Sequence, residues 1–177
     1  KGFEVVPPLL TPFFLQEFVN AIAQKHMGLK STKVPDFVLK SIYQLIWRRQ
    51  KKMNVLASRF RYYRPFTNIF EEADAVRGVV SFAAQFGEGW LLPSDIISMV
   101  NQGVNNVVSL QPFGCIANHI VSKGIEKKLK EKFPQLNLVS LDFDSGVSAV
   151  NVTNRLLLFL DSIAVQHVST GRTSVSC

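Results

Sequence analysis

Cysteine is scarce in this sequence. The 177 residues include only two, Cys115 and Cys177. Two isolated cysteines cannot build a disulfide framework, and without a CxxC pair they do not form a structural zinc motif. Apolar runs of membrane-spanning length and lipidation motifs are also lacking. We therefore expect a protein of a reducing compartment, the cytoplasm, without a membrane partner.

Acidic residues are scarce between Lys25 and Arg64. This segment holds eleven of the twenty Lys and Arg but one of the thirteen acids, Asp36, which leaves nine basic residues against twelve acids elsewhere. Such a basic block is typical of a solvated helix face or a docking surface, or it holds phosphates of a nucleic acid or a coenzyme A tail. The sequence has no RNA- or DNA-binding motif, so nucleic acid is not the expected partner.

Residues 1–68 form the first predicted region, which is basic and helical. After a short strand at Phe3–Val6, a helix is predicted from Thr11 to near Gly28, because Pro at the first position and Gly after the end are typical helix boundaries. A longer helix is predicted from Asp36 to Arg64, where Pro65 ends it. Its apolar residues recur at spacings of three and four, as in a core-facing stripe that Arg49 interrupts. This stripe is Val38, Ile42, Leu45, Ile46, Met53, Leu56 and Phe60.

Residues 69–165 form a predicted α/β domain, followed by a polar tail, 166–177, that we expect to be mobile. Strands and helices alternate in its second half, which predicts a parallel sheet covered on both faces. The fold class is therefore α/β, a flavodoxin-like three-layer domain, complete or partial, with a helical N-terminal extension. The predicted elements are a helix at 69–83, a loop at 86–92, a helix at 93–102, a strand at 104–110, a helix at 116–133, a strand at 136–143 and a helix ending at 165.

Two loops of this domain are predicted to share one edge of the sheet. Ligands of open parallel sheets bind at the carboxyl ends of the strands, where Gln111–Cys115 and Asp142–Ser148 would lie. Cys115 would begin a helix, whose free N–H groups stabilise a thiolate, and His119 would share its helix face. Three roles stay open for Cys115: a nucleophile, a metal or iron–sulfur ligand, or a small buried side chain.

Acidic residues in loops give further candidates. Asp142 and Asp144 follow a predicted strand, where a carboxylate binds a ribose or a metal, moves a proton, or only caps the next helix, as Ser145 also can. Glu88, between two glycines, is a candidate catalytic acid or a solvated side chain. Candidate catalytic residues are therefore Glu88 and His119. The candidate cofactor-binding residues are Gln111, Gly114, Cys115, Asn118, Asp142, Asp144 and Ser145.

Several of these motifs, in this order, resemble a known family. The chain is similar, from about Val76 to Ser162, to the C-terminal region of acyl-CoA dehydratase activase-related proteins, relatives of the 2-hydroxyacyl-CoA dehydratase and benzoyl-CoA reductase systems of anaerobic bacteria. The motifs that carry the resemblance are Gly87–Leu92, Gln111–His119 with Lys123–Gly124, Leu141–Gly146 and Asn151–Arg155.

The resemblance implies a fragment of a larger electron-transferring iron–sulfur protein. Cys115 would be one ligand of a [4Fe-4S] cluster, with His119 and Gln111 lining its pocket. One thiolate is an incomplete ligand set, and ATP would bind only in other domains. The implied partners are other domains of the same polypeptide, or a dehydratase or activase, with acyl-CoA as a further ligand.

Two expectations follow for the chain itself. Because it begins at Lys1 without a methionine, we expect it to be a piece of a longer protein that is inactive alone. The alternative is a non-catalytic structural or interaction module of α/β fold, with Cys115 buried and inert.

Overall fold

The chain folds as two compact units, Lys1–Ser98 and Met99–Cys177. The computed structural model describes residues 3–29, 33–85, 87–144, 146 and 148–171, with the side chains of 166–171 left out. The first unit includes residues 69–98, which the sequence-based division placed in the α/β domain. Among the described residues, no helix is both long enough and apolar enough to cross a membrane.

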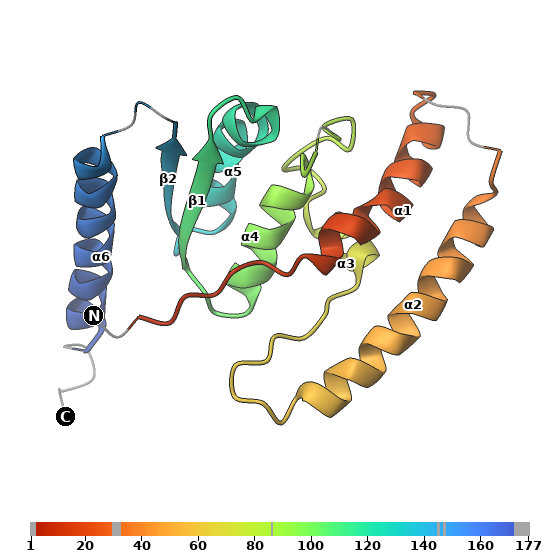
Figure 1. Ribbon diagram of the computed structural model, residues 1–177, viewed down its shortest axis with the longest axis horizontal. Helices are drawn as coiled ribbons and strands as arrows, with labels where there is room; N and C mark the ends of the chain where they lie inside the picture. Colours follow the sequence, from red (N-terminus) through yellow and green to blue (C-terminus); the bar gives the residue numbers. More distant parts are fainter. Residues whose placement is uncertain (1–2, 30–32, 86, 145, 147, 172–177) are drawn as a thin grey trace. The chain divides into compact units, whose positions relative to one another are not determined.

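The first unit is built from helices, labelled in Figure 1. They are α1 (Thr11–His26), α2 (Asp36–Ala57), α3 (Ile69–Ala75) and the start of α4 (Leu91–Asn101), which continues into the second unit. The expected strand at Phe3–Val6 is wrong, because these residues form no strand. Helix α1 confirms the predicted start and end: Pro12 lies in its first turn, and Gly28 follows it with a φ of 68°.

Helix α2 ends earlier than its sequence predicts. It stops at Ala57 rather than near Arg64, because the chain folds back across its last turn. The Asn54 side chain binds both backbone groups of Phe66: its amide donates to the carbonyl and its oxygen accepts from the N–H, each at 2.9 Å. The Ser58 hydroxyl also donates to the Val55 carbonyl, at 2.8 Å. The Val55 and Ala57 carbonyls at the end of the helix thus accept hydrogen bonds from the residues that follow, Ser58 and Phe60, and the helix ends at Ala57.

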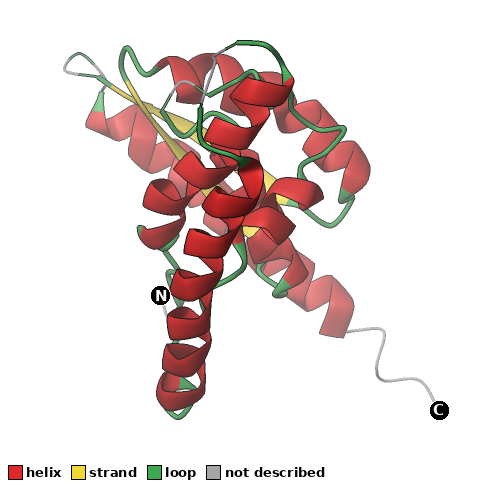
Figure 2. Ribbon diagram, turned by 90° about the vertical axis from the view of Figure 1, so that its right-hand side faces the viewer, coloured by secondary structure: helices red, strands yellow, loops and turns green. Residues whose placement is uncertain are grey.

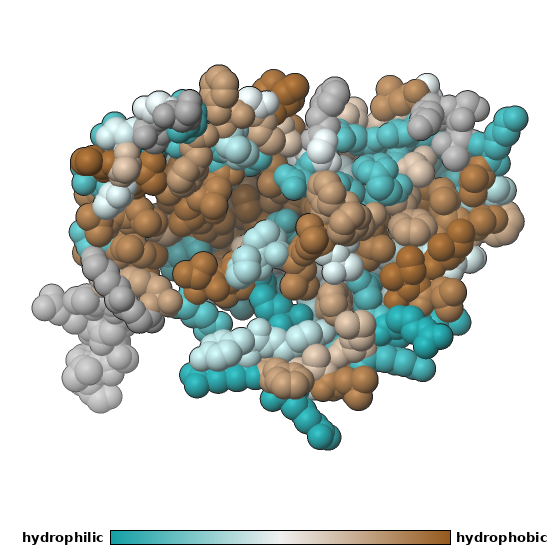
Figure 3. Space-filling model, viewed as in Figure 1, coloured by the Kyte–Doolittle hydropathy of each residue, from teal (hydrophilic) through white to brown (hydrophobic). Residues whose placement is uncertain are grey.

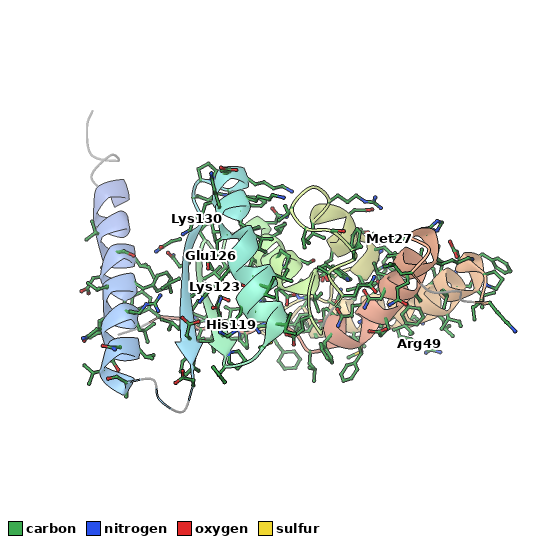
Figure 4. All side chains as sticks on the ribbon, turned by 90° about the horizontal axis from the view of Figure 1, so that it is seen from above. Met27, Arg49, His119, Lys123, Glu126 and Lys130 are labelled. Carbon is green, nitrogen blue, oxygen red and sulfur yellow. The ribbon has the colours of Figure 1, made fainter. Side chains whose placement is uncertain are left out.

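The predicted core stripe of α2 is largely exposed. Tyr43 and Gln50 face the interior, whereas Leu45 is 60% and Leu56 75% exposed. Figure 3 shows brown, apolar areas at its right, where α2 lies, and Arg49 of the same helix is labelled in Figure 4. The sequence-based assignment of the packed face was therefore wrong, because the apolar arc of α2 is wider than the part that packs.

Helix α3 is also shorter than predicted. The expected helix from Ile69 to Ala83 ends at Ala75, and Gly78 then adopts a φ of 81°, which a continuing right-handed helix does not allow. The α3 N-terminus is capped by the Asn68 side chain, which accepts from the Phe70 N–H at 3.1 Å.

Two buried aromatic side chains bind the helices of the first unit together. The Tyr43 hydroxyl, on α2, donates to Asn68 Oδ1 and accepts from the Ile69 N–H, both at 2.9 Å. The Trp90 indole N–H donates to Asn20 Oδ1 of α1 at 2.8 Å. Both rings are fully buried, so their polar groups depend on these bonds.

The second unit has the predicted α/β fold. Its strands, β1 (Asn106–Pro112) and β2 (Asn137–Phe143), form a two-stranded parallel sheet, shown in yellow in Figure 2. They are paired in register from Asn106 with Asn137 to Pro112 with Phe143. The connection between them contains a π-helix, η1 (Ala117–Ser122), and α5 (Lys123–Lys132), and α6 (Ala149–Gly171) follows β2. The single regular helix predicted over 116–133 is thus divided into a π-helical and an α-helical part.

Helices pack on both faces of the strand pair. Residues in register in parallel strands point to the same face. On one face, Ser109 Oγ lies 3.2 Å from Ser122 Oγ of η1, and the Ser140 hydroxyl donates to the Glu126 carboxylate of α5. On the other, the Asn137 amide donates to Ser162 Oγ of α6 at 3.0 Å.

Candidate functional site

The carboxyl ends of β1 and β2 meet, as predicted for the site. Gln111 is in register with Asp142, and the N–H of Phe113 donates to the Phe143 carbonyl at 2.8 Å, so the loops leave the sheet side by side. Gly114 turns the first loop with a φ of 76°, a conformation that other residues rarely adopt. This turn places Cys115 directly before the helical segment.

The Cys115 thiol is partly exposed and accepts a hydrogen bond. Asn118 Nδ2 donates to its Sγ at 3.0 Å, and Asn118 itself is buried. His119 does not bind the sulfur. Its Nδ1 lies 3.0 Å from the Cys115 carbonyl oxygen, which can only accept, so Nδ1 carries the proton and donates. A cysteine–histidine pair for nucleophilic catalysis is therefore not formed, because the ring is held by the backbone.

A row of charged side chains extends from this corner along η1 and α5. His119, Lys123, Glu126 and Lys130 follow one another along one side of these helices, near β2 (Figure 4). Lys123 Nζ donates to Asp142 Oδ1 at 2.9 Å, and His119 Nε2 lies 3.7 Å from the same oxygen. The hydrogen bond from Lys123 and the nearby positive charges keep the pKa of Asp142 below its ordinary value. Sequence reasoning proposed no role for Lys123, although its spacing of four from His119 places both on one helix face.

Replacing Lys123 by Met tests this ion pair. Because the ammonium group that stabilises the Asp142 carboxylate is lost, we expect the pKa of Asp142 to rise toward its ordinary value. Carbon NMR of the carboxyl group against pH measures it. Lys127→Met is the matched control, since Lys127 lies beside Glu131 instead. A pKa of Asp142 that is the same in Lys123→Met as in the parent would contradict the contact.

Gln111 is the least satisfied polar side chain of this corner. It is 0% exposed, and neither its amide nitrogen nor its amide oxygen has a hydrogen-bond partner in the described part of the chain. Register places it on the same face as Asp142, the face toward η1. An unpaired buried polar group costs about 1–3 kcal/mol, so Gln111 is suited to a ligand that both donates and accepts.

Three candidates remain: Asp144, Ser145 and Glu88. Asp144 is exposed, and its Oδ1 accepts from the Gly146 N–H at 2.7 Å, so its carboxylate stabilises its own loop. Ser145 lies outside the described residues. Glu88 belongs to the first unit.

Glu88 instead takes part in an acidic cluster that the sequence did not reveal. Glu72 is buried, with the Thr67 hydroxyl on one carboxylate oxygen and no partner on the other within the described residues. Burial raises the pKa of Glu72. Burial, together with the charges of Glu72 and Glu88, raises the pKa of Asp95 to about 7, against the opposing charge of Arg64. Widely spaced acids on separate elements leave no local sequence signal.

The donor set limits which metal groups the chain can hold. Across the residues that the structure describes, no three His, Cys, Asp or Glu side chains are placed to bind a metal ion. A four-iron cluster takes four cysteine thiolates. Cys115 therefore fits one ligand position, and the described residues do not fit a complete cluster.

Comparisons with known proteins add no assignment: no family model, curated protein or solved structure matches this chain.

Proposed function

We propose that the second unit supplies one thiolate ligand, Cys115, and one wall of an iron–sulfur site that other domains or a partner protein complete. The observation that carries the proposal is the corner itself. At the carboxyl ends of two parallel strands, a fully buried Gln111 amide has no partner among the described residues, and a partly exposed thiol follows four residues later. A [4Fe-4S] cluster at this place would carry single electrons at low potential.

The neighbours of Cys115 support a ligand more than a nucleophile. Sulfur atoms of clusters and thiolates accept N–H hydrogen bonds, which tune the reduction potential. The Asn118 amide already donates to Cys115 Sγ, and the Gln111 amide has N–H groups to spare. Among the described residues no base contacts the thiol, as a hydrolase would require, because His119 donates to the backbone.

The fold family, the parent protein and its partners are part of the same proposal. Two consecutive parallel strands joined by a helical crossover are the repeating unit of a flavodoxin-like sheet, so the second unit is proposed as part of such a domain. The proposed parent is an acyl-CoA dehydratase- or activase-type protein of the cytoplasm, with acyl-CoA near the site and ATP in other domains. Its partners would be those domains or a separate dehydratase or activase.

A ligand-exchange experiment tests the thiolate. The chain, purified without oxygen, is mixed with a synthetic [4Fe-4S] cluster carrying exchangeable thiolates, and the visible charge-transfer band is followed through gel filtration. We expect the band to elute with the chain while free thiol is present and to be lost when it is removed, because the chain supplies one ligand. Cys115→Ser should lose the band.

Cys177→Ser is the matched control, which should keep the band because it changes the other cysteine. Equal iron retention by Cys115→Ser and the parent would contradict the proposal. A cluster that stays bound after the free thiol is removed would contradict the single-ligand part of it.

The alternative function is a non-catalytic structural or interaction module in which Cys115 is inert. The burial expected for Cys115 in this alternative is wrong, because its side chain is partly exposed. The alternative is favoured by one observation, that Cys115 is the sole thiol in the described part of the chain. In that case Cys115 would bind no iron, and its alkylation by iodoacetamide would be no faster than that of a free cysteine.

A further inference from the structure

The first unit contains a cavity that the proposed iron–sulfur site does not use. Its volume is about 570 Å³, within the range of small-molecule sites. It lies between α1, α2 and α3, with Phe82 from the following loop. Buried Val19 and Ala73 contribute to its apolar lining, and the other apolar lining residues are Ile22, Ala23, Met27, Phe70 and Phe82. Met27, labelled in Figure 4, directly follows α1.

The polar lining of this cavity has an excess of positive charge. It includes the cationic or protonatable side chains of His26, Lys40 and Arg77 and one acid, Asp74. Asp74 is already bound by Arg77, whose Nε lies 2.7 Å from Asp74 Oδ1. His26 Nε2 lies 2.8 Å from Asp36 Oδ2, and the same carboxylate also binds Lys25. Asp74 and Asp36 are therefore each occupied by a basic partner.

Lys40 is the third basic residue of the lining. It is exposed on α2, and its ammonium group has no hydrogen bond or ion pair among the described residues. Two neutral amides, of Gln44 and Asn68, also line the cavity. An apolar cavity with a free ammonium group and a few polar groups is complementary to a molecule with an apolar body and one negative group.

We propose that this cavity binds an amphipathic anion, with its apolar body against α1 and α3 and its carboxylate or equivalent acid at Lys40. A cation would meet unfavourable charge there, and a strongly polar molecule would leave its groups unpaired against the apolar lining. The proposal does not depend on Cys115, since all lining residues belong to the first unit.

Fluorescence titration with dansyl-labelled undecanoate and its methyl ester tests the proposal on the full chain. The two probes share an apolar body and differ in the charge. We expect both to bind, and the carboxylate to bind about three- to tenfold more tightly, as for a partly exposed ion pair. Unlabelled undecanoate should displace the labelled acid.

Two variants locate the binding. Lys40→Met should reduce the affinity for the carboxylate to that for the ester and leave the affinity for the ester unchanged. Ala23→Phe should weaken both probes, because the ring fills the cavity. Lys52→Met is the control, an exposed lysine of the same helix outside the cavity, and should change neither affinity.

Three results would overturn the proposal. They are the absence of saturable binding by either probe, equal affinities of the parent for acid and ester, and an equal loss of carboxylate affinity in Lys52→Met and Lys40→Met. The last would show attraction to the basic surface in general. Because Lys40 is exposed, its replacement leaves the fold intact, and circular dichroism verifies this for each variant.

Discussion

Tyr43→Phe should lower the free energy of unfolding of the first unit by about 2–3 kcal/mol. The hydroxyl is fully buried, donates to Asn68 Oδ1 and accepts from the Ile69 N–H, and so joins α2 to the start of α3. Without it, the N–H of Ile69 stays buried and unpaired. Urea unfolding followed by tryptophan fluorescence measures the change, because both tryptophans, Trp47 and Trp90, lie in the first unit.

Tyr62→Phe is the matched control for this experiment. Tyr62 is 68% exposed, and its hydroxyl makes no hydrogen bond within the described residues. We expect its replacement to change the free energy of unfolding by less than about 0.5 kcal/mol. If both variants unfold at the urea concentration of the parent, the buried hydroxyl does not stabilise the unit.

Asp95→Asn should remove a large part of the pH dependence of stability of the first unit, and the part that remains should include that of Glu72, whose pKa burial also raises. In the folded chain the pKa of Asp95 is about 7, against an ordinary value of 3.8. An acid with a raised folded pKa contributes fully below its unfolded pKa, and its contribution is lost as the pH rises through the folded pKa. The parent should therefore lose on the order of 4 kcal/mol between about pH 4 and pH 8. The amide variant lacks this loss and should be the more stable protein at about pH 8.

The measurement is urea unfolding at several pH values between about pH 5 and pH 8. Asp74→Asn is the control, because Asp74 is exposed and paired with Arg77. Its pH dependence should follow that of the parent. If the free energy of unfolding of the parent is constant over this pH range, the pKa of Asp95 is not raised by folding and the prediction is wrong.

Local patterns predicted most elements of this fold. Pro12 and Gly28 marked the limits of α1, and the apolar runs marked both strands, because these signals act within a few residues. Helix α2 shows where such signals fail. Its apolar residues cover a wider arc than one packed face needs, so spacing alone could not select Tyr43 and Gln50 over Leu45 and Leu56 as the residues that face inward.

Local patterns also predicted only part of the candidate site. Strand ends and helix starts placed Gln111, Cys115 and Asp142 together, since parallel strands align their carboxyl ends. The bond from His119 to the Cys115 carbonyl depends on side-chain rotamers, which spacing does not determine. The π-helical η1 has no sequence signature at all.

The strand pair has a consequence for hydrogen exchange. In the described part of the chain, each strand pairs on one edge only, and a two-stranded sheet is marginal by itself. The backbone amides of β1 and β2 that point away from the partner strand should exchange with deuterated water through small local openings. The Ile69 amide, which donates to the Tyr43 hydroxyl, should exchange only when its unit unfolds. Slower exchange at the outer edge of either strand would then report that another strand or protein has docked there, and so gives an assay for such a partner before its identity is known.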